Sequence, residues 1–111
     1  MDRLETYRQI IRSVLQPYTQ ITYANVDATN HAVFDPETDR YIIVSVGWGT
    51  KRRVHGCLIH VEMIDGKVWI QRDGTEDGIA NELVEAGIPK PEIVLGFREP
   101  HIRPYTGFGV A

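Results

Sequence analysis

The side chains that could carry out chemistry are four histidines and a single cysteine. No two of the histidines form an H-x-x-x-H or H-E-x-x-H motif, which would place two metal ligands on one helix face. Cys57 would need a base beside it to act as a nucleophile, and His55 is its nearest histidine in sequence. An enzyme would have to use His60 with Glu62, or His31 paired with His55 across adjoining strands. We therefore predict no catalytic residue, no cofactor and no metal site, and we interpret Cys57 as a small buried hydrophobic residue.

An acidic cluster at Asp73, Glu76 and Asp77 has side chains that bind cations in other proteins. It lacks the ligand spacing of an EF-hand loop, which also requires a glutamate at its last position. Acidic residues are favoured in the first turn of a helix, where the backbone dipole attracts negative charge. We interpret this cluster as the start of a helix.

Basic and aromatic residues gather where Trp48 is followed by Lys51, Arg52 and Arg53. Basic side chains at a turn can contact phosphate oxygens, so Lys51 and Arg52 are candidate phosphate contacts, although such residues also simply solvate a turn. An exposed tryptophan is a candidate anchor for a protein partner. The alternative is that both tryptophans lie under the C-terminal tail. The candidate partner-binding residues are Trp48, Arg53, His60, Trp69, Arg103 and Tyr105.

Three β-hairpins are expected to position these residues. Asp65-Gly66 lies between two apolar runs, which favours a type I′ turn and places Val61 opposite Ile70. Other turns are expected at residues 35–39 and 49–52, so the predicted strands cover residues 32–34, 41–48, 53–64 and 67–72. The predicted apolar face contains Val33, Ile42, Val44, Cys57, Ile59, Val61, Val68 and Ile70. The opposite face would carry His60, Glu62, Trp69 and Gln71.

Two helices are expected to flank the sheet. Asp2 and Glu5 have the spacing of a capping box, and apolar residues then recur at helical spacing, which predicts a helix over residues 3–15. Thr75 as N-cap and Gly87 as the left-handed residue after the last turn predict a second helix over residues 76–86. The segment 18–30 is expected to be loop with some strand, and 91–97 a helical turn or a strand. The predicted fold class is α+β: a four-stranded antiparallel meander covered by an N-terminal helix and a second helix after the sheet, with an extended C-terminal tail that docks.

The 111 residues are expected to form a single domain, residues 1–111. A net charge of −3 argues against a general nucleic-acid-binding protein, which usually has a strong basic bias. A single cysteine excludes an internal disulfide and favours the reducing cytoplasm. We expect no secretory signal at the polar N-terminus, and no apolar run approaches the roughly 20 residues of a membrane span.

Motifs occur in a fixed order along essentially the whole chain: Tyr7 in the first helix, Asp35, Tyr41, Gly47-Trp48, Arg53, His60, Gly66-Lys67-Val68-Trp69-Ile70, Thr75-Glu76-Asp77-Gly78-Ile79-Ala80, Leu83, Gly87-Ile88-Pro89-Lys90, Ile93-Val94-Leu95-Gly96-Phe97 and Arg103-Pro104-Tyr105-Thr106. With this spacing the chain resembles the XisI family, the cyanobacterial fdxN element excision controlling factors. Its last residues, Phe108-Gly109-Val110-Ala111, depart slightly from the Phe-Ala-Val-Ala expected there. The family offers no established catalytic residues to transfer.

The resemblance implies a role beside a site-specific recombinase in excising a DNA element during heterocyst differentiation, with a XisH-like protein as partner. We interpret the chain as a non-enzymatic regulatory or interaction protein. The first alternative is an accessory factor that binds DNA directly through Lys51, Arg52 and Arg53, with Arg98 and Arg103 in support. The second is an unrecognised small enzyme. A symmetric homodimer is also considered, because it is the commonest form of self-association.

Overall fold

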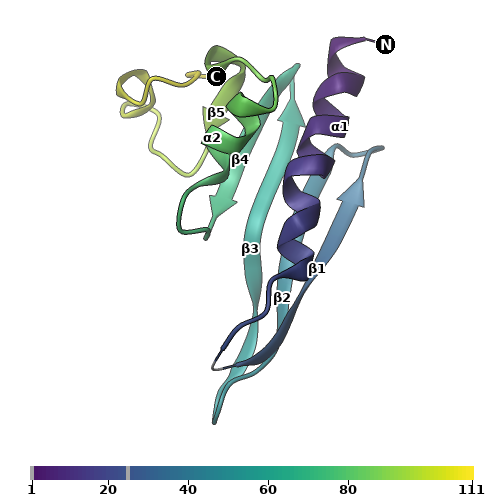
Figure 1. The fold of residues 1–111 in the computed structure, drawn as a ribbon. Helices are drawn as coiled ribbons and strands as arrows, with labels where there is room; N and C mark the ends of the chain where they lie inside the picture. Colours follow the sequence, from purple (N-terminus) through teal and green to yellow (C-terminus); the bar gives the residue numbers. More distant parts are fainter. Residues whose placement is uncertain (1, 25) are drawn as a thin grey trace.

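The computed structural model describes residues 2–24 and 26–111, which form a layer of helices against one face of a five-stranded sheet (Figure 1). The strands lie in sequence order: β1 (Asp27–Asp35), β2 (Arg40–Trp48), β3 (Arg53–Ile64), β4 (Lys67–Asp73) and β5 (Ile93–Leu95). The first four strands are antiparallel, and β5 is parallel to β4. The α+β class and the four-stranded meander are therefore confirmed, but the sheet is mixed and has one more strand than predicted.

Helix α1 (Arg3–Leu15) has the predicted bounds, because the signals that set it are local. The Asp2 carboxylate accepts a hydrogen bond from the Glu5 backbone N–H at 2.8 Å, as an N-cap requires. Its apolar stripe, Tyr7, Ile11 and Leu15, is buried against the sheet. The chain then continues as a 3₁₀ helix, η1 (Gln16–Gln20), where a loop was predicted. That predicted loop also contains Asn25, which lies outside the described residues.

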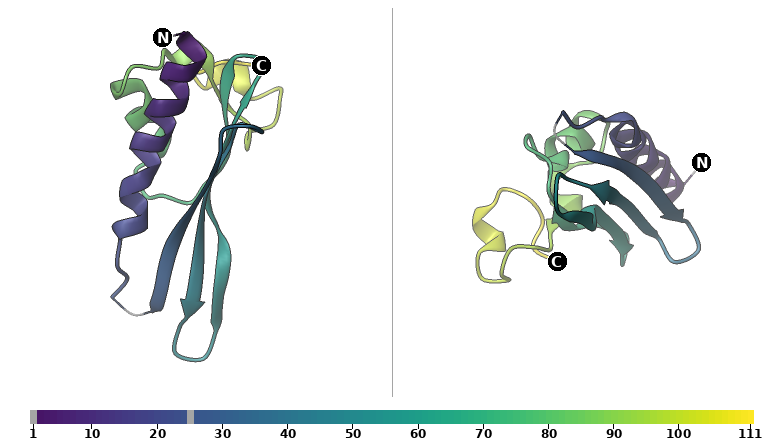
Figure 2. Two further views of the ribbon diagram at one scale, coloured as in Figure 1. Left: turned by 90° about the vertical axis from the view of Figure 1, so that its right-hand side faces the viewer. Right: turned by 90° about the horizontal axis from the view of Figure 1, so that it is seen from below.

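The core lies between α1, helix α2 (Ile79–Glu85) and one face of the sheet (Figure 2). The sheet contributes Tyr41, Ile43, Ile59, Val61, Met63, Val68 and Ile70 to it. Ile79, Leu83 and Ile88 close it from the α2 side. No helix in the described part of the chain is both long and apolar enough to cross a membrane.

A β-bulge in β3 makes part of the predicted apolar face wrong. Trp48 pairs with Arg53, as predicted, but Ile43 rather than Ile42 lies opposite Ile59. The register shifts because Leu58 is an extra residue in β3, and one extra residue exchanges the two faces of a strand. Ile43 consequently enters the core.

The residues displaced by this shift lie on the other face of the sheet. Cys57, predicted to be buried, is exposed, and Val33 is 52% exposed. Ile42 and Val44 are only partly buried. The sheet therefore has apolar side chains on both faces, and in the described part of the chain α1 and α2 cover one of them (Figure 2).

Helix α2 begins later than predicted, because Asp73 and not Thr75 organises its start. The Asp73 carboxylate accepts hydrogen bonds from the backbone N–H groups of Thr75 at 3.0 Å and Ile79 at 2.8 Å. Gly78, with φ +81°, separates this turn from the helix. The predicted end is confirmed: Gly87 has φ +122°, and the Ile88 N–H donates to the Leu83 carbonyl at 3.0 Å.

The C-terminal tail leaves β5 and returns to it, as the prediction of a docked tail requires. The Gly109 N–H donates to the Ile93 carbonyl at 2.7 Å, and Gly109 forms an isolated bridge with Val94. Between these points the tail forms a loop on the side of the sheet opposite α1 (Figure 2). Segment 91–97, predicted as a turn or a strand, contains the end of a short 3₁₀ helix and then β5.

Candidate partner-binding surface

The face of β1, β2 and β3 turned away from α1 is called here the open face. Directly opposite residues of paired strands lie on the same face, and side chains alternate along each strand. Because Tyr41 and Ile43 point into the core, their neighbours in β2 point to the open face. With their partners in the register, the open face carries Thr29, His31, Val33, Ile42, Val44, Val46, Trp48, Arg53, His55, Cys57 and His60.

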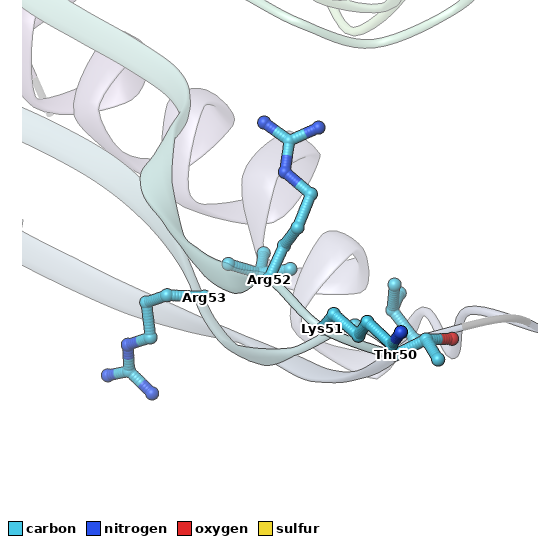
Figure 3. A pocket seen from close by; sticks show the side chains of 7 residues that line it. Thr50, Lys51, Arg52 and Arg53 are labelled. Carbon is cyan, nitrogen blue, oxygen red and sulfur yellow. The ribbon is translucent and has the colours of Figure 1, made fainter.

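At the turn between β2 and β3, Trp48 and Arg53 form an exposed pair. Trp48 is 57% exposed, and the Arg53 guanidinium carbon lies 5.4 Å from the centre of its ring. Arg53 Nη1 also donates to the Gly47 carbonyl at 3.3 Å. Lys51 and Arg52 are exposed at the same turn, and Figure 3 shows Arg52 and Arg53 pointing to opposite sides of it. Residues 48–53, called here the hairpin tip, therefore combine one accessible aromatic ring with three basic side chains.

At the other end of the sheet, Trp69 and Arg103 form a second pair, but this one belongs to the packing of the tail. The Arg103 guanidinium carbon lies 5.1 Å from the centre of the Trp69 ring. Its Nε donates to the Arg98 carbonyl at 3.1 Å, and its Nη2 donates to the Gly96 carbonyl at 3.3 Å. Tyr105, in contrast, is 86% exposed. Of the two tryptophans, only Trp69 lies under the tail.

His60 and Glu62 meet on the surface between these two ends. His60 Nε2 lies 2.8 Å from Glu62 Oε1, and both side chains are partly exposed. Surface pockets of the described residues lie at the hairpin tip, around η1 and along residues 54–58. Neither His60 nor Glu62 lines these pockets. The pair has the geometry of a hydrogen-bonded surface pair.

The other predicted combination, His31 with His55, is wrong because β2 lies between their strands. His31 is opposite Val44, and its Nε2 lies 2.9 Å from Thr29 Oγ1. Within the part of the chain that the structure describes, no three histidine, cysteine, aspartate or glutamate side chains converge as metal ligands would.

The environment of Cys57 does not activate its thiol. Cys57 is exposed as a residue, but its sulfur is partly buried, which raises the pKa of the thiol above its ordinary value; the nearby Arg72 only partly opposes this effect. The Sγ donates a hydrogen bond to the Ile59 carbonyl at 3.3 Å. The thiol form therefore predominates at neutral pH, whereas a nucleophilic cysteine requires the thiolate.

The structure thus places the predicted site residues in separate groups. Trp48, Arg53, Lys51 and Arg52 lie together at the hairpin tip, His60 lies in mid-sheet, and Trp69 with Arg103 lies under the tail. Sequence reasoning missed the apolar part of the open face, Val33, Ile42 and Val44. Its signal was the unbroken apolar run of residues 41–44, because a strand with only one apolar face alternates.

Comparison with solved structures finds chains of similar fold. The chain is similar to the crystal structure of a XisI-like protein from Anabaena variabilis ATCC 29413, with 34% identity and a TM-score of 0.87 over 98% of this chain and 100% of that chain. It is also similar to the fdxN element excision controlling factor XisI from the same organism, with 31% identity and a TM-score of 0.84 over 99% of this chain and 100% of that chain.

No curated protein sequence matches the chain significantly. The family model described as "XisI protein" matches residues 1–110. This match covers nearly the whole sequence and agrees with the two structural similarities, each of which also covers nearly the whole chain. The chain therefore belongs to the XisI family.

Proposed function

We propose that this chain is a regulatory interaction protein, without catalysis of its own, that acts with a XisH-like partner in the excision of a DNA element by site-specific recombination. Membership of the XisI family supports the controlling role, since one similar structure is named as an excision controlling factor. The proposal includes the cytoplasm of a cyanobacterium during heterocyst differentiation as its setting. The observation that carries the interaction role is the open face of the sheet.

The open face has the composition of a protein-contact surface. Trp48 and Val33 are more than half exposed, and Ile42 and Val44 lie between them in the neighbouring strand. Exposed apolar residues in a contiguous patch mark interaction sites more often than isolated ones do. Tryptophan and arginine are the residues most enriched among those that dominate binding energy, and Arg53 adds the second of these types.

The test is co-purification with the XisH-like protein, using two variants of the open face. Trp48→Ala removes the exposed ring, and Val33→Glu places a charge within the apolar patch. Each is expected to weaken the complex about tenfold or more, because truncating a central aromatic anchor typically costs about 2 kcal/mol or more. Tyr105→Ala is the matched control: it removes an even more exposed ring, which belongs to the C-terminal tail and not to β1, β2 or β3.

A complex that loses affinity only with Tyr105→Ala would place the partner on the tail and contradict the open face as the site. Absence of any complex at micromolar concentrations would contradict the interaction role itself. Circular dichroism of each variant distinguishes a lost contact from a lost fold.

Direct DNA binding is the second candidate function, and the hairpin tip is the observation that favours it. Lys51 and Arg52 are exposed at the end of a hairpin that projects from the body of the molecule (Figure 1). If the tip contacts duplex phosphates, the affinity should fall steeply with salt, and Lys51→Gln with Arg52→Gln should flatten that dependence. Duplex binding that is absent at low salt would remove this candidate.

A further inference from the structure

Among the residues that the structure describes, the half of β3 nearest the hairpin tip has a strand neighbour on one side only. Strand β4 pairs with β3 from Ile59 to Ile64, whereas β2 pairs with β3 as far as Arg53. The Gly74 N–H donates a hydrogen bond to the Leu58 carbonyl at 2.7 Å, and the chain then leaves the sheet toward α2. Residues 53–57, called here the free edge, therefore lie where a longer β4 would have paired with them.

The free edge carries little that would prevent another strand from pairing. Natural edges are usually protected by inward-pointing charges, prolines or a covering element. Arg53 is the charged residue of this segment, and its side chain folds back over Trp48 and the Gly47 carbonyl. Gly56 has no side chain, and a Cβ built there would have no atom within 4 Å. Another backbone can therefore approach closely.

The two ends of the free edge differ in net charge, with acidic residues outnumbering the exposed Arg72 at the end near Cys57. Lys51 and Arg52 are exposed at the hairpin tip, and Glu76 and Asp77 are exposed in the loop that Gly74 anchors beside Leu58. Within residues 2–24 and 26–111, the ion pairs are formed by other side chains. Both charged groups are thus available to a neighbour.

We propose that the free edge pairs antiparallel with the free edge of a second copy of this chain, which creates a two-fold symmetric dimer with one continuous sheet. Antiparallel pairing around a two-fold axis brings the tip of each copy to the 74–77 loop of the other. Lys51 and Arg52 of one copy then face Glu76 and Asp77 of the other, and the same contact occurs twice. The charge pattern is therefore complementary to itself.

The outer edge of β1 does not share this property. Its strand begins at Asp27 and ends at Asp35, so antiparallel pairing of two copies would bring aspartates of opposite ends together. Like charges across an interface oppose association. Of these two edges, the β3 edge is therefore the one suited to self-pairing. The two-fold axis is perpendicular to the sheet, so both open faces stay exposed on the same side of the dimer.

A charge-swap experiment tests this arrangement by light scattering across a range of protein concentrations. The wild type is expected to change from the mass of one chain to that of two. Lys51→Glu/Arg52→Glu and, separately, Glu76→Lys/Asp77→Lys are each expected to weaken dimerisation about tenfold or more, because both symmetric contacts become repulsive. Mixing the two variants restores opposite charges at both contacts, so the mixture is expected to form heterodimers with affinity near that of the wild type.

Hydrogen exchange supplies the second readout, because residues 53–57 should exchange more slowly at concentrations where the dimer forms. A wild type that stays monomeric, a dimer that neither variant weakens, or a mixture that stays monomeric would each overturn the proposal. A dimer without slower exchange at the free edge would overturn it as well. These outcomes are independent of the proposed function, because the experiment contains neither a XisH-like protein nor DNA. A separate duplex-binding experiment covers the second candidate function: a wild type that stays monomeric and binds duplex, with that binding lost in Lys51→Glu/Arg52→Glu, would assign the tip to DNA instead.

Discussion

Two tryptophan–arginine pairs lie at opposite ends of the same sheet, and their local geometry is nearly the same. The guanidinium carbon lies 5.4 Å from the ring centre in Trp48–Arg53 and 5.1 Å in Trp69–Arg103. The difference lies in what each arginine does besides stacking. Arg53 contacts the backbone of its own hairpin, whereas Arg103 comes from the tail and bonds to carbonyls that follow β5.

This difference separates a contact that maintains the fold from a surface that remains available. The Trp69 ring is partly buried beneath a segment distant in sequence, so removing it disturbs the docking of the tail. The Trp48 ring remains largely in solvent, so its removal leaves the monomer nearly unchanged. Stacking geometry alone therefore does not identify a binding residue. The exposure of the ring distinguishes a residue available to a partner from one that packs within the fold.

The largest expected effect on stability is that of Trp69→Ala. Burying a tryptophan in a core contributes about 3–5 kcal/mol relative to alanine, and this ring is only partly buried, so we expect a loss of about 2–3 kcal/mol in the free energy of unfolding. Urea denaturation measures this loss. The matched variant Trp48→Ala is expected to change the same free energy by about 0.5 kcal/mol or less, since surface substitutions rarely do more. Equal losses in the two variants would contradict the comparison.

The tail packs at the opposite end of the sheet, and at the hairpin end the close approach of β1 to β2 at Gly47 stabilises the structure instead. Gly47→Ala tests the contribution of this close approach. A Cβ on Gly47 would lie 2.1 Å from the Asp27 carbonyl oxygen and 2.4 Å from the Ala28 Cα, so the two strands must separate. Overpacking of this kind costs about 1–3 kcal/mol, which thermal denaturation detects as a lower Tm.

Gly56→Ala on the neighbouring strand is the control for that experiment, because a Cβ there has open space around it. It is expected to be neutral or slightly stabilising in dilute solution, since alanine loses less conformational freedom than glycine on folding. A destabilisation by Gly56→Ala as large as that by Gly47→Ala would show that close packing is not the cause.

The elements predicted correctly are those set by neighbouring residues. The Asp2 cap and the helical stripe give α1, and Asp65-Gly66 gives the last hairpin, in which both residues have positive φ. The first helix and this turn need no information from distant parts of the chain. The end of α2 at Gly87 belongs to the same group.

The elements predicted wrongly depend on contacts distant in sequence. The bulge at Leu58 lies between the pairing of β3 with β2 and the contact with Gly74, so no local signal indicates that Cys57 faces solvent. The sequence leaves segment 91–97 open between a helical turn and a strand, because periodicity cannot distinguish the two in so few residues; pairing with β4 makes residues 93–95 the fifth strand, which the predicted four-stranded sheet lacks. The site residues were found by type, but their separation into exposed and tail-covered groups required the tertiary structure.

A smaller effect is expected in the pH dependence of stability, and it arises from two tyrosines, Tyr18 and Tyr41, on the side of the sheet that the helices cover. Burial, and then the hydrogen bond to Glu82, raises the pKa of Tyr18 to about 12, and burial also raises that of Tyr41 to about 12. A raised folded-state pKa contributes stability that is fully present below the ordinary value of 10.0 and is lost as the pH rises toward about 12. Urea midpoints should therefore fall steeply above pH 10.

Tyr18→Phe removes one of these titrating groups, so its urea midpoint should fall less between pH 9 and pH 11 than that of the wild type. At neutral pH the variant should be less stable, because the Tyr18 hydroxyl donates to Glu82 at 2.5 Å and the carboxylate loses this donor. Parallel midpoint curves for the two proteins would contradict the assigned cause.

The smallest expected effects come from substituting the two arginines. These substitutions test the two tryptophan–arginine pairs separately from the rings, because each leaves its tryptophan in place. Arg103→Gln removes the guanidinium above Trp69 and two hydrogen bonds to carbonyls, which should cost about 1 kcal/mol of folding free energy. Arg53→Gln removes an exposed cation–π contact and a single hydrogen bond of 3.3 Å, and should cost about 0.3 kcal/mol. Tryptophan fluorescence with urea denaturation measures both, and proteolysis should cut the tail faster in Arg103→Gln alone. Faster tail cleavage in both variants would mean that the hairpin and the tail are coupled, and the two pairs could not then be assigned to separate roles.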